Sequence, residues 1–532
     1  MATHLAAVFR SHWLVPVGLV IVGLSLTGSV ARADDSEPQR VEAPELDGAV
    51  GWLNTAGPLK LKDLKGKIVL MDFWTYCCIN CIHMLPDLAK LEKKYPNELV
   101  VIGVHSAKFE NEKQSENIRK AILRYEITHP VINDAEMKIW DNYGVSSWPT
   151  LYLIDPEGYA VWGTKGEGHY DDLVKQIDKL IAVHKEKKTL NEKPMRFELA
   201  RNKETGESPL FFPGKVLADG ASNRLFIADS THHRIVITDL EGKKIAIAGV
   251  GTSGKEDGAF DKASFNDPQG MALNGETLYV ADRKNHLIRA LDLKEKTVKT
   301  VAGTGKQGFN REKEGPALEI GLNSPWDILF KDNTLFIAQA GHHQIWTMDL
   351  KKGKLGPYAG TGDENIHDGN LREANFAQPS GLTTDGKMLY VADSEVSAVR
   401  TVPMGGTGKV GTIVGLGLFK FGDVDGVGDT VRLQHALGVT YVDGLLYVAD
   451  TYNSKIKVID PEKYSCETFL GGDGRGWYAD PLFVEPAGIS HAKGKLYVAD
   501  TNAHRIRVVD IKDKSVSTLE LKGVEPPKAE KP

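Results

Sequence analysis

Cysteine is scarce in this sequence, with four residues in a chain of 532. Small secreted folds that are held together by disulfides need a much higher density of cysteine, so this class is excluded. Net charge is also small, at −6, because 65 lysine and arginine residues nearly balance 71 aspartate and glutamate residues. Without a basic excess, the chain offers no general electrostatic attraction to nucleic acid or to anionic lipid.

Long apolar runs are rare as well, and the most conspicuous one lies near the N-terminus. Residues 14–26 read LVPVGLVIVGLSL, follow Arg10, and lead to small residues that end in Ala-Arg-Ala at 31–33. This is the layout of a secretory signal, and the run is short for a bilayer span of about 20 residues. We predict a signal over 1–33 and an exported protein, periplasmic or extracellular. An uncleaved membrane anchor remains the alternative.

What the chain does contain falls into two different patterns, and its length alone calls for two or more domains. Apolar runs that alternate with helical spacing predict an α/β domain with a partly parallel sheet over 41–183. Its expected strands lie at 67–74, 98–106, 130–132 and 150–158, and its expected helices at 79–94, 111–126, 136–143 and 170–183.

Three of the four cysteines lie within the segment TYCCINC at 75–81. Cys78 and Cys81 fall where a buried strand has ended and a helix begins. Free backbone N–H groups and the helix dipole stabilise a thiolate at such a position. A second thiol one helical turn later is placed to resolve a mixed disulfide, so this spacing indicates redox chemistry.

The segment VLMDFWTYCCINCIHMLP at 69–86 resembles the active-site segment of the thioredoxin family. Asp72 stands at the position of that family's buried acid, Trp74 at the end of its strand, and Pro86 at its helix-kinking proline. The later segment Ser-Trp-Pro-Thr at 147–150 resembles its cis-proline loop. The resemblance implies a thioredoxin-like fold and thiol–disulfide oxidoreductase activity without a cofactor.

The same resemblance implies roles for single residues. Cys78 would be the attacking thiolate and Cys81 the resolving thiol. Asp72 would relay protons near Cys81, and Pro149 would shape the substrate groove. Cys77 replaces the tryptophan usual in the family and is expected to be an accessory thiol or a packing residue.

Several questions about the cysteine site stay open. Ile79-Asn80 replaces the usual Gly-Pro between the cysteines, so the direction of the redox reaction is not predicted. Thiol peroxidase activity, suggested weakly by Thr75, and a non-catalytic interaction scaffold are the alternatives. We expect no metal, because a helix from Ile79 would scatter potential zinc ligands such as His83. His83 is expected to be a surface or packing residue, as is His105.

A charged linker is expected over 184–209, with one short strand at 196–199, and a repeat follows it. Copies of a segment such as LYVAD begin at residues 225, 278, 335, 389, 446 and 496, each with short alternating strands and glycine-rich turns. This period predicts a six-bladed β-propeller over 210–521, followed by a disordered tail at 522–532. The unit resembles the NHL repeat, whose naming letters stand at 285–287.

Residues that recur in nearly every repeat are expected to serve the blade and not a site. We expect the recurring aspartates (Asp229, Asp282, Asp393, Asp450 and Asp500) to cap turns, and the pairs His232-His233 and His342-His343 to be turn residues. The blade rims mix charges of both signs, so we predict that the propeller recruits a protein or peptide and no nucleic acid.

The order of the two domains resembles a family in which a thioredoxin-like domain precedes NHL repeats. The segments DFWTYCCINC, GVHSAKF and WPTL carry this likeness. In that family a β-rich C-terminal domain follows the blades, and we do not expect it here. The combined hypothesis is an exported thiol–disulfide oxidoreductase whose propeller recruits a protein partner.

Overall fold

The computed structural model describes residues 41–199, 208–472 and 482–527, which belong to one compact unit, Val41–Pro532. The signal predicted over 1–33 lies outside the described residues. Within those three ranges, no helix is long and apolar enough to cross a membrane.

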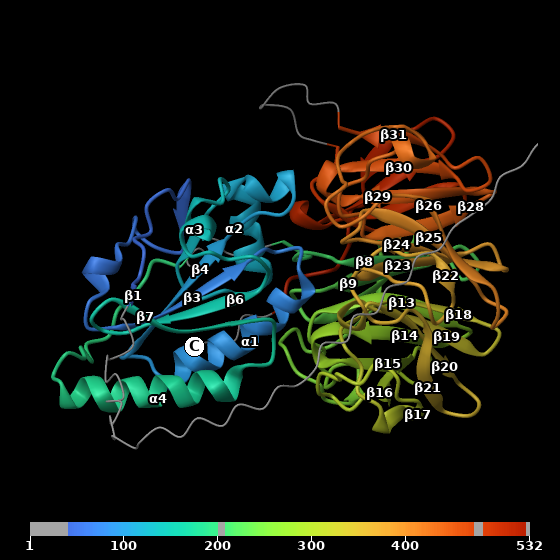
Figure 1. The fold of residues 1–532 in the computed structure, drawn as a ribbon. Coiled ribbons are helices and arrows are strands. Elements are labelled where there is room, and N and C mark those ends of the chain that lie inside the picture. Colours follow the sequence, from blue (N-terminus) through green and yellow to red (C-terminus); the bar gives the residue numbers. More distant parts are fainter. Residues whose placement is uncertain (1–40, 200–207, 473–481, 528–532) are drawn as a thin grey trace, which may run out of the picture. The chain divides into compact units, whose positions relative to one another are not determined.

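The first domain is a seven-stranded mixed sheet with helices on both sides (Figure 1). The strand order is β1-β7-β6-β3-β4-β5-β2, in which β3, β4 and β5 are parallel neighbours and β6 pairs antiparallel with β3. The strands are β1 Val41–Glu42, β2 Gly51–Leu53, β3 Ile68–Trp74, β4 Leu99–His105, β5 Val131–Asn133, β6 Thr150–Ile154 and β7 Tyr159–Lys165. The helices are η1 Leu61–Leu64, α1 Ile79–Lys94, η2 Glu110–Lys113, α2 Ser115–Arg124, α3 Lys138–Asn142 and α4 Tyr170–Glu186.

The central strands β3 and β4 are buried along their whole length, as their continuous apolar runs predict. Alternate side chains of β3 therefore serve two cores. Ile68, Leu70 and Trp74 pack with α1, α2 and α4, whereas Met71 and Phe73 pack with α3 and η1. This arrangement carries the end of β3, and the cysteines that follow it, to one edge of the sheet.

Two expected elements of the first domain need correction. The helix expected over 111–126 is divided at Gln114 into η2 and α2, because the carboxylate of Glu112 turns inward and binds backbone N–H groups. The strand expected at 196–199 is not present in the described residues, where the backbone makes no sheet ladder. Phe197 instead packs its side chain against the α3 side of the sheet.

The second domain consists, in its described part, of six small antiparallel sheets, the blades of a propeller (Figure 1). Blade 1 is β8 Lys215–Asp219, β9 Arg224–Asp229, β10 Arg234–Asp239 and β11 Lys244–Ala248; blade 2 is β12 Gly258–Ala259, β13 Pro268–Asn274, β14 Thr277–Asp282, β15 Leu287–Asp292 and β16 Thr297–Ala302; blade 3 is β17 Gly315–Pro316, β18 Pro325–Lys331, β19 Thr334–Gln339, β20 Gln344–Asp349 and β21 Lys354–Ala359. Blade 4 is β22 Gly369–Asn370, β23 Pro379–Thr384, β24 Met388–Asp393, β25 Ala398–Pro403 and β26 Lys409–Val414; blade 5 is β27 Gly426–Val427, β28 Gly438–Val442, β29 Leu445–Asp450, β30 Lys455–Asp460 and β31 Ser465–Gly471; blade 6 is β32 Pro486–Ala492, β33 Lys495–Asp500, β34 Arg505–Asp510 and β35 Val516–Thr518. Short 3-10 helices connect several of these strands: η4 Arg283–Asn285, η5 Ala317–Glu319, η6 Ala340–His342, η7 Gly428–Thr430, η8 Thr451–Asn453 and η9 Thr501–Ala503.

One hydrogen bond recurs between neighbouring blades and closes the circle. In each blade a histidine or serine has a positive φ in the turn that follows one of the strands β9, β14, β19, β24, β29 and β33. Its side chain accepts a hydrogen bond from the backbone N–H of the residue at the start of the next blade. We call these six acceptor positions turn residues and the six donors ring residues. The pairs are His233 with Asp267, His286 with Ser324, His343 with Gln378, Ser397 with His435, Ser454 with Glu485 and, across the closure, His504 with Phe212.

The recurring aspartates connect segments that are far apart in the sequence. One carboxylate oxygen of Asp282 accepts from the N–H of Asn266, 16 residues earlier, at 2.8 Å. The other accepts from Asn285 in the following turn and from Arg289 in the next strand. The residue therefore ties an incoming loop to the blade, in addition to the turn that the sequence predicted.

The tail expected at 522–532 also needs correction, since residues 522–527 are packed on the first blade. Lys522 exchanges backbone hydrogen bonds with Gly242 and Lys244 at 2.9 and 3.0 Å. Val524 is buried in the same core as blades 1 and 6. The remaining residues of this tail lie outside the described part of the chain.

Candidate redox site and its contact with the propeller

Cys78 is the N-cap of α1 and lies immediately beyond the buried strand β3. Its Sγ accepts a hydrogen bond from the backbone N–H of Cys81 at 3.4 Å. Cys78 is partly exposed and Cys81 is fully buried, and both are free thiols. One sulfur can therefore meet a substrate, while the other waits one helical turn behind it.

A buried carboxyl group lies behind the cysteines. Asp72 is fully buried in β3, and its two oxygens have no hydrogen-bond partner among the described residues. Burial raises the pKa of Asp72 to about 7, and the charge of His129 partly opposes the shift. Burial, together with the hydrogen bond to Cys78, raises the pKa of the Cys81 thiol well above its usual range. The Cys81 thiol is therefore protonated at neutral pH.

Aromatic side chains fix the end of β3. Trp74 is fully buried and meets the ring of His105 edge-on at 5.0 Å. His105 Nε2 accepts the backbone N–H of Tyr76 at 3.3 Å, and burial lowers the pKa of His105 to about 3. The imidazole therefore stays neutral and acts in packing, one of the two roles that the sequence suggested.

Pro149 lies beside the end of β3, because Thr150 is the cross-strand partner of Phe73. The Trp148–Pro149 peptide bond is cis. The indole N–H of Trp148 donates to the backbone carbonyl of Ser106 at 2.9 Å, which links this loop to the end of β4. The cysteine segment and the proline loop thus end at the same edge of the sheet.

Cys77 differs from its neighbour in its surroundings. Its side chain is 2% exposed, and burial raises the pKa of its thiol well above the usual range. Its backbone N–H donates to Glu112 Oε1 at 2.9 Å. Glu112 also accepts the N–H groups of Lys108 and Phe109, and burial raises its pKa to about 7. This buried acid gave no signal in the sequence, where it belongs to the polar stretch ENEK.

The propeller contacts the cysteine segment directly, which sequence reasoning missed. Four ring residues, Ser324, Gln378, His435 and Glu485, each meet a side chain or backbone group of the first domain. Gln378 binds the backbone on both sides of Cys78. Glu485 Oε1 accepts from Tyr76 at 3.2 Å and from Asn111 at 2.7 Å. The ring residues differ in type from blade to blade, so the repeat pattern does not reveal this surface.

His83, two residues after Cys81, takes part in the same contact. Its Nδ1 lies 2.6 Å from Glu167 Oε2 and its Nε2 lies 2.6 Å from Ser324 Oγ. Gln307 Nε2 of the propeller donates to Glu167 Oε2 at 3.1 Å and lies 2.9 Å from His83 Nδ1. The sequence expectation of a surface or packing residue therefore needs correction, because His83 is a polar bridge between the two domains.

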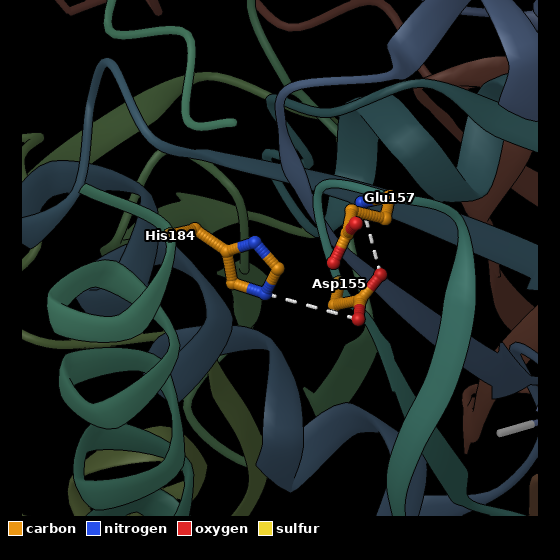
Figure 2. A group of neighbouring side chains, drawn as sticks. All are labelled: Asp155, Glu157 and His184. Carbon is orange, nitrogen blue, oxygen red and sulfur yellow. Dashed lines mark hydrogen bonds and ion pairs between the residues drawn. The ribbon is translucent and has the colours of Figure 1, made fainter. Parts of the chain in front are cut away.

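Figure 2 shows a separate group, Asp155, Glu157 and His184, whose potential metal-ligand atoms lie within 4.8 Å of one another. Its side chains already have partners. Asp155 Oδ1 accepts the backbone N–H groups of Glu157 and Tyr159, and Glu157 pairs with Lys187 at 3.4 Å. The group stabilises the turn between β6 and β7 and the end of α4, and the geometry gives no reason to assign a metal.

Comparison with known families agrees with both parts of this architecture. Residues 66–160 match a family described as thioredoxin-like, and residues 265–291 match the NHL repeat. The first match contains the cysteine segment and the proline loop. The second contains β13, β14 and most of β15 in blade 2, including one ring residue and one turn residue.

Three relatives show how far the similarity extends. NHL repeat-containing protein 2 of Bos taurus is 44% identical over 491 residues, which are 85% of this chain and 67% of that protein. Protein SUPPRESSOR OF QUENCHING 1, chloroplastic, of Arabidopsis thaliana is 44% identical over 521 residues, covering 93% of this chain and 49% of that protein. Thiol-disulfide oxidoreductase YkuV of Bacillus subtilis is 27% identical over 144 residues, covering 27% of this chain and 96% of that protein. The chain thus spans about two thirds of the animal relative and about half of the plant one.

Proposed function

Because this chain belongs to the family of NHL repeat-containing protein 2, we propose that it is a thiol–disulfide oxidoreductase that acts through Cys78 and Cys81. The observation that carries the proposal is the pairing of a partly exposed thiol at the start of α1 with a buried thiol one turn later. A buried carboxyl group behind them, Asp72, supports it.

In the reducing direction, the Cys78 thiolate attacks one sulfur of a substrate disulfide. A mixed disulfide forms between Cys78 and the substrate, and the other substrate sulfur leaves as a thiolate. Asp72 then accepts the proton of the Cys81 thiol. The Cys81 thiolate attacks Cys78 Sγ, releases the second substrate thiolate and leaves a Cys78–Cys81 disulfide. Two electrons pass from the protein to the substrate, and the reverse sequence oxidises a dithiol.

We also propose that the protein is exported. The support is the layout of residues 10–33, with a positive charge, an apolar run and small residues around Ala33. An exported dithiol would meet disulfides in an oxidising compartment. Detection of a mature N-terminus near Asp34 in the exported fraction is the expected result, and a full-length chain in the membrane fraction would contradict cleavage.

The propeller is proposed to recruit a protein or peptide through surfaces outside the ring residues. Four of the six ring side chains already contact the thioredoxin-like domain of the same chain. A partner would therefore use the loops at the blade rims, where side chains such as Phe309 and Phe419 are exposed. Pull-down with the full chain at moderate salt is expected to capture protein, and salt-sensitive capture of nucleic acid alone would contradict the proposal.

The oxidoreductase proposal is tested by trapping the mixed disulfide. In Cys81→Ser the resolving thiol is absent, so the adduct on Cys78 is expected to accumulate and to be released by dithiothreitol. The wild-type protein is expected to reduce insulin disulfides in the presence of dithiothreitol, and Cys78→Ser to lose this activity.

Cys466 provides a matched control, because it is a buried thiol in blade 5, remote in sequence from the site. Cys466→Ala is expected to retain the activity. If wild type shows no thiol-dependent adduct and no disulfide reduction, and cells tolerate the Cys78→Ser, Cys81→Ser double variant, the scaffold alternative is supported instead.

A further inference from the structure

Gln378 of the propeller is fully buried, at the start of blade 4, with its amide against the cysteine segment. Its Oε1 accepts the backbone N–H of Ile79 at 2.8 Å. Its Nε2 donates to the backbone carbonyl of Cys77 at 3.0 Å. One side chain therefore holds the peptide groups on both sides of Cys78.

The propeller fixes this amide firmly. The backbone N–H of Gln378 donates to His343 Nδ1 at 3.1 Å, which is the recurring bond between neighbouring blades. The Ser394 hydroxyl donates to the backbone carbonyl of Gln378 at 2.9 Å. The side-chain Nε2 of Gln378 in turn donates to Ser394 Oγ at 3.3 Å. With φ at 63°, the residue occupies the left-handed region that all six ring residues share. The amide thus has few alternative orientations.

The contact with Ile79 has an electrostatic consequence for the neighbouring sulfur. The N–H of Ile79 is one of the free donors at the start of α1, which form the positive end of the helix dipole. These donors are what stabilises a thiolate at Cys78. The side-chain amide oxygen of Gln378 accepts a hydrogen bond from one of these donors, the N–H of Ile79, and places partial negative charge at the same helix end. It therefore reduces the stabilisation that the helix offers to the thiolate.

We propose that Gln378 is a positioning residue of the redox site, through which the propeller holds the Cys78 segment and sets the reactivity of its thiol. The inference rests on the proposed function only in taking Cys78 as the reacting thiol. It makes the propeller a working component of the site, in addition to any surface that it offers to a partner. A change in the contact between the domains would then change the chemistry of Cys78.

The test measures alkylation of Cys78 by iodoacetamide in the reduced full chain as a function of pH, with the labelled residue located by mass spectrometry. Gln378→Met preserves the length of the side chain and removes the amide. The pH midpoint of Cys78 alkylation is expected to fall by about 0.5 to 1 unit, because the helix end no longer faces the amide oxygen. The Cys78–Cys81 reduction potential is expected to become less negative, because a more stable thiolate favours the reduced form.

Gln378→Glu provides the opposite change, since it keeps an oxygen acceptor and can add negative charge. Its alkylation midpoint is expected to stay at the wild-type value or to rise. Gln434→Met is the matched control, because Gln434 is another buried glutamine of the propeller whose Oε1 accepts from Asn111 across the same contact, at 3.4 Å. That variant is expected to leave the midpoint unchanged.

The expected fall in the alkylation midpoint is about 0.5 to 1 pH unit. The proposal is overturned if the midpoint of Gln378→Met stays within about 0.2 pH units of wild type, or if it rises. It is also overturned if Gln434→Met shifts the midpoint as much, since the effect would then belong to the contact in general. Alkylation needs no substrate, so the outcome is independent of the oxidoreductase test: a shift with no disulfide reduction would sink the proposed function and leave this inference standing.

Discussion

At the scale of single residues, Asp72 places an ionisable group in a fully buried strand of the sheet. Its pKa rises from 3.8 to about 7 on folding, chiefly through burial. The folded protein therefore binds more protons than the unfolded chain between about pH 4 and pH 7. By linkage, the contribution of Asp72 to the stability of the fold is greatest below this window and falls as pH rises through it. The difference of about 3 pKa units corresponds to roughly 4 kcal/mol at 1.36 kcal/mol per unit.

Asp72→Asn is expected to remove this dependence, because the amide is neutral at every pH and has nearly the same shape. The urea midpoint of the reduced variant should exceed that of wild type at pH 8 and approach it at pH 5. The rate at which Cys81 resolves the mixed disulfide should also fall by about 10-fold or more, because the variant has no base for the Cys81 thiol. Other buried acids titrate in both proteins, so the comparison isolates Asp72. Equal midpoints at pH 8 would show that its carboxyl group is not penalised by burial.

The sequence predicted the residues of the redox motif, but it did not predict the propeller residue that supports them. Cys78, Cys81, Asp72 and Pro149 lie in segments whose type and spacing resemble a known site, and the structure places all of these segments at one sheet edge. Gln378 gave no such signal. It occupies a ring position whose residue type changes in every blade, so only the contact between the two domains shows that its side chain meets the cysteine segment.

At the scale of elements, β3 and α1 were predicted almost to the residue, because a continuous apolar run and regular helical spacing determine them. The segment after β4 was not. Its polar residues predict one exposed helix, but Glu112 turns inward and binds three backbone N–H groups. A glutamate with a structural role inside the fold has the same local pattern as one on the surface, and only contacts distant in sequence separate them.

The bond between blades predicts which substitutions a turn residue tolerates. His233 Nδ1 accepts the N–H of Asp267 at 3.2 Å, and burial lowers the pKa of His233, which keeps the ring neutral and able to accept. His233→Ala leaves a buried N–H unsatisfied and is expected to destabilise the propeller by about 1 to 3 kcal/mol. Asparagine tolerates a positive φ and offers an oxygen near the position of Nδ1, so His233→Asn should keep most of the stability.

Urea unfolding of the full chain, followed by tryptophan fluorescence, measures this difference, with wild type and the two variants compared at one pH. An equal loss in both variants would mean that the imidazole acts through packing and not as an acceptor.

At the scale of the whole molecule, the two domains share a contact made of polar groups and aromatic rings. A cavity of about 290 Å³ lies between Pro86 of the first domain and Lys284 of the propeller. The cavity beside Cys77 and Tyr76 has a volume of about 40 Å³. Phe109 lies against His435 and Tyr452 at 5.3 and 5.5 Å between ring centres. Lys108 pairs with Glu395 of blade 4. The sequence predicted each domain separately, but a repeat that looks alike in every blade cannot indicate which face binds another domain.

Glu485 is the residue on which the last prediction depends, because three groups of the thioredoxin-like domain converge on its carboxylate. Tyr76 and Asn111 donate hydrogen bonds to it, and the Arg124 guanidinium lies 3.6 Å from Oε2. Glu485→Ala would leave the half-buried Arg124 without its carboxylate and the hydrogen-bond donors of Tyr76 and Asn111 without their acceptor, a change that costs about 3 to 5 kcal/mol in comparable sites. We expect the variant to loosen the contact between the domains while each domain stays folded.

Labelling of Cys77, which is 2% exposed in the intact chain, should then accelerate by roughly 100-fold. Glu462→Ala, a change at an exposed glutamate on the edge of blade 5, serves as the control and should label at the wild-type rate. Unchanged labelling of Cys77 in Glu485→Ala would show that the other contacts hold the two domains together without this carboxylate.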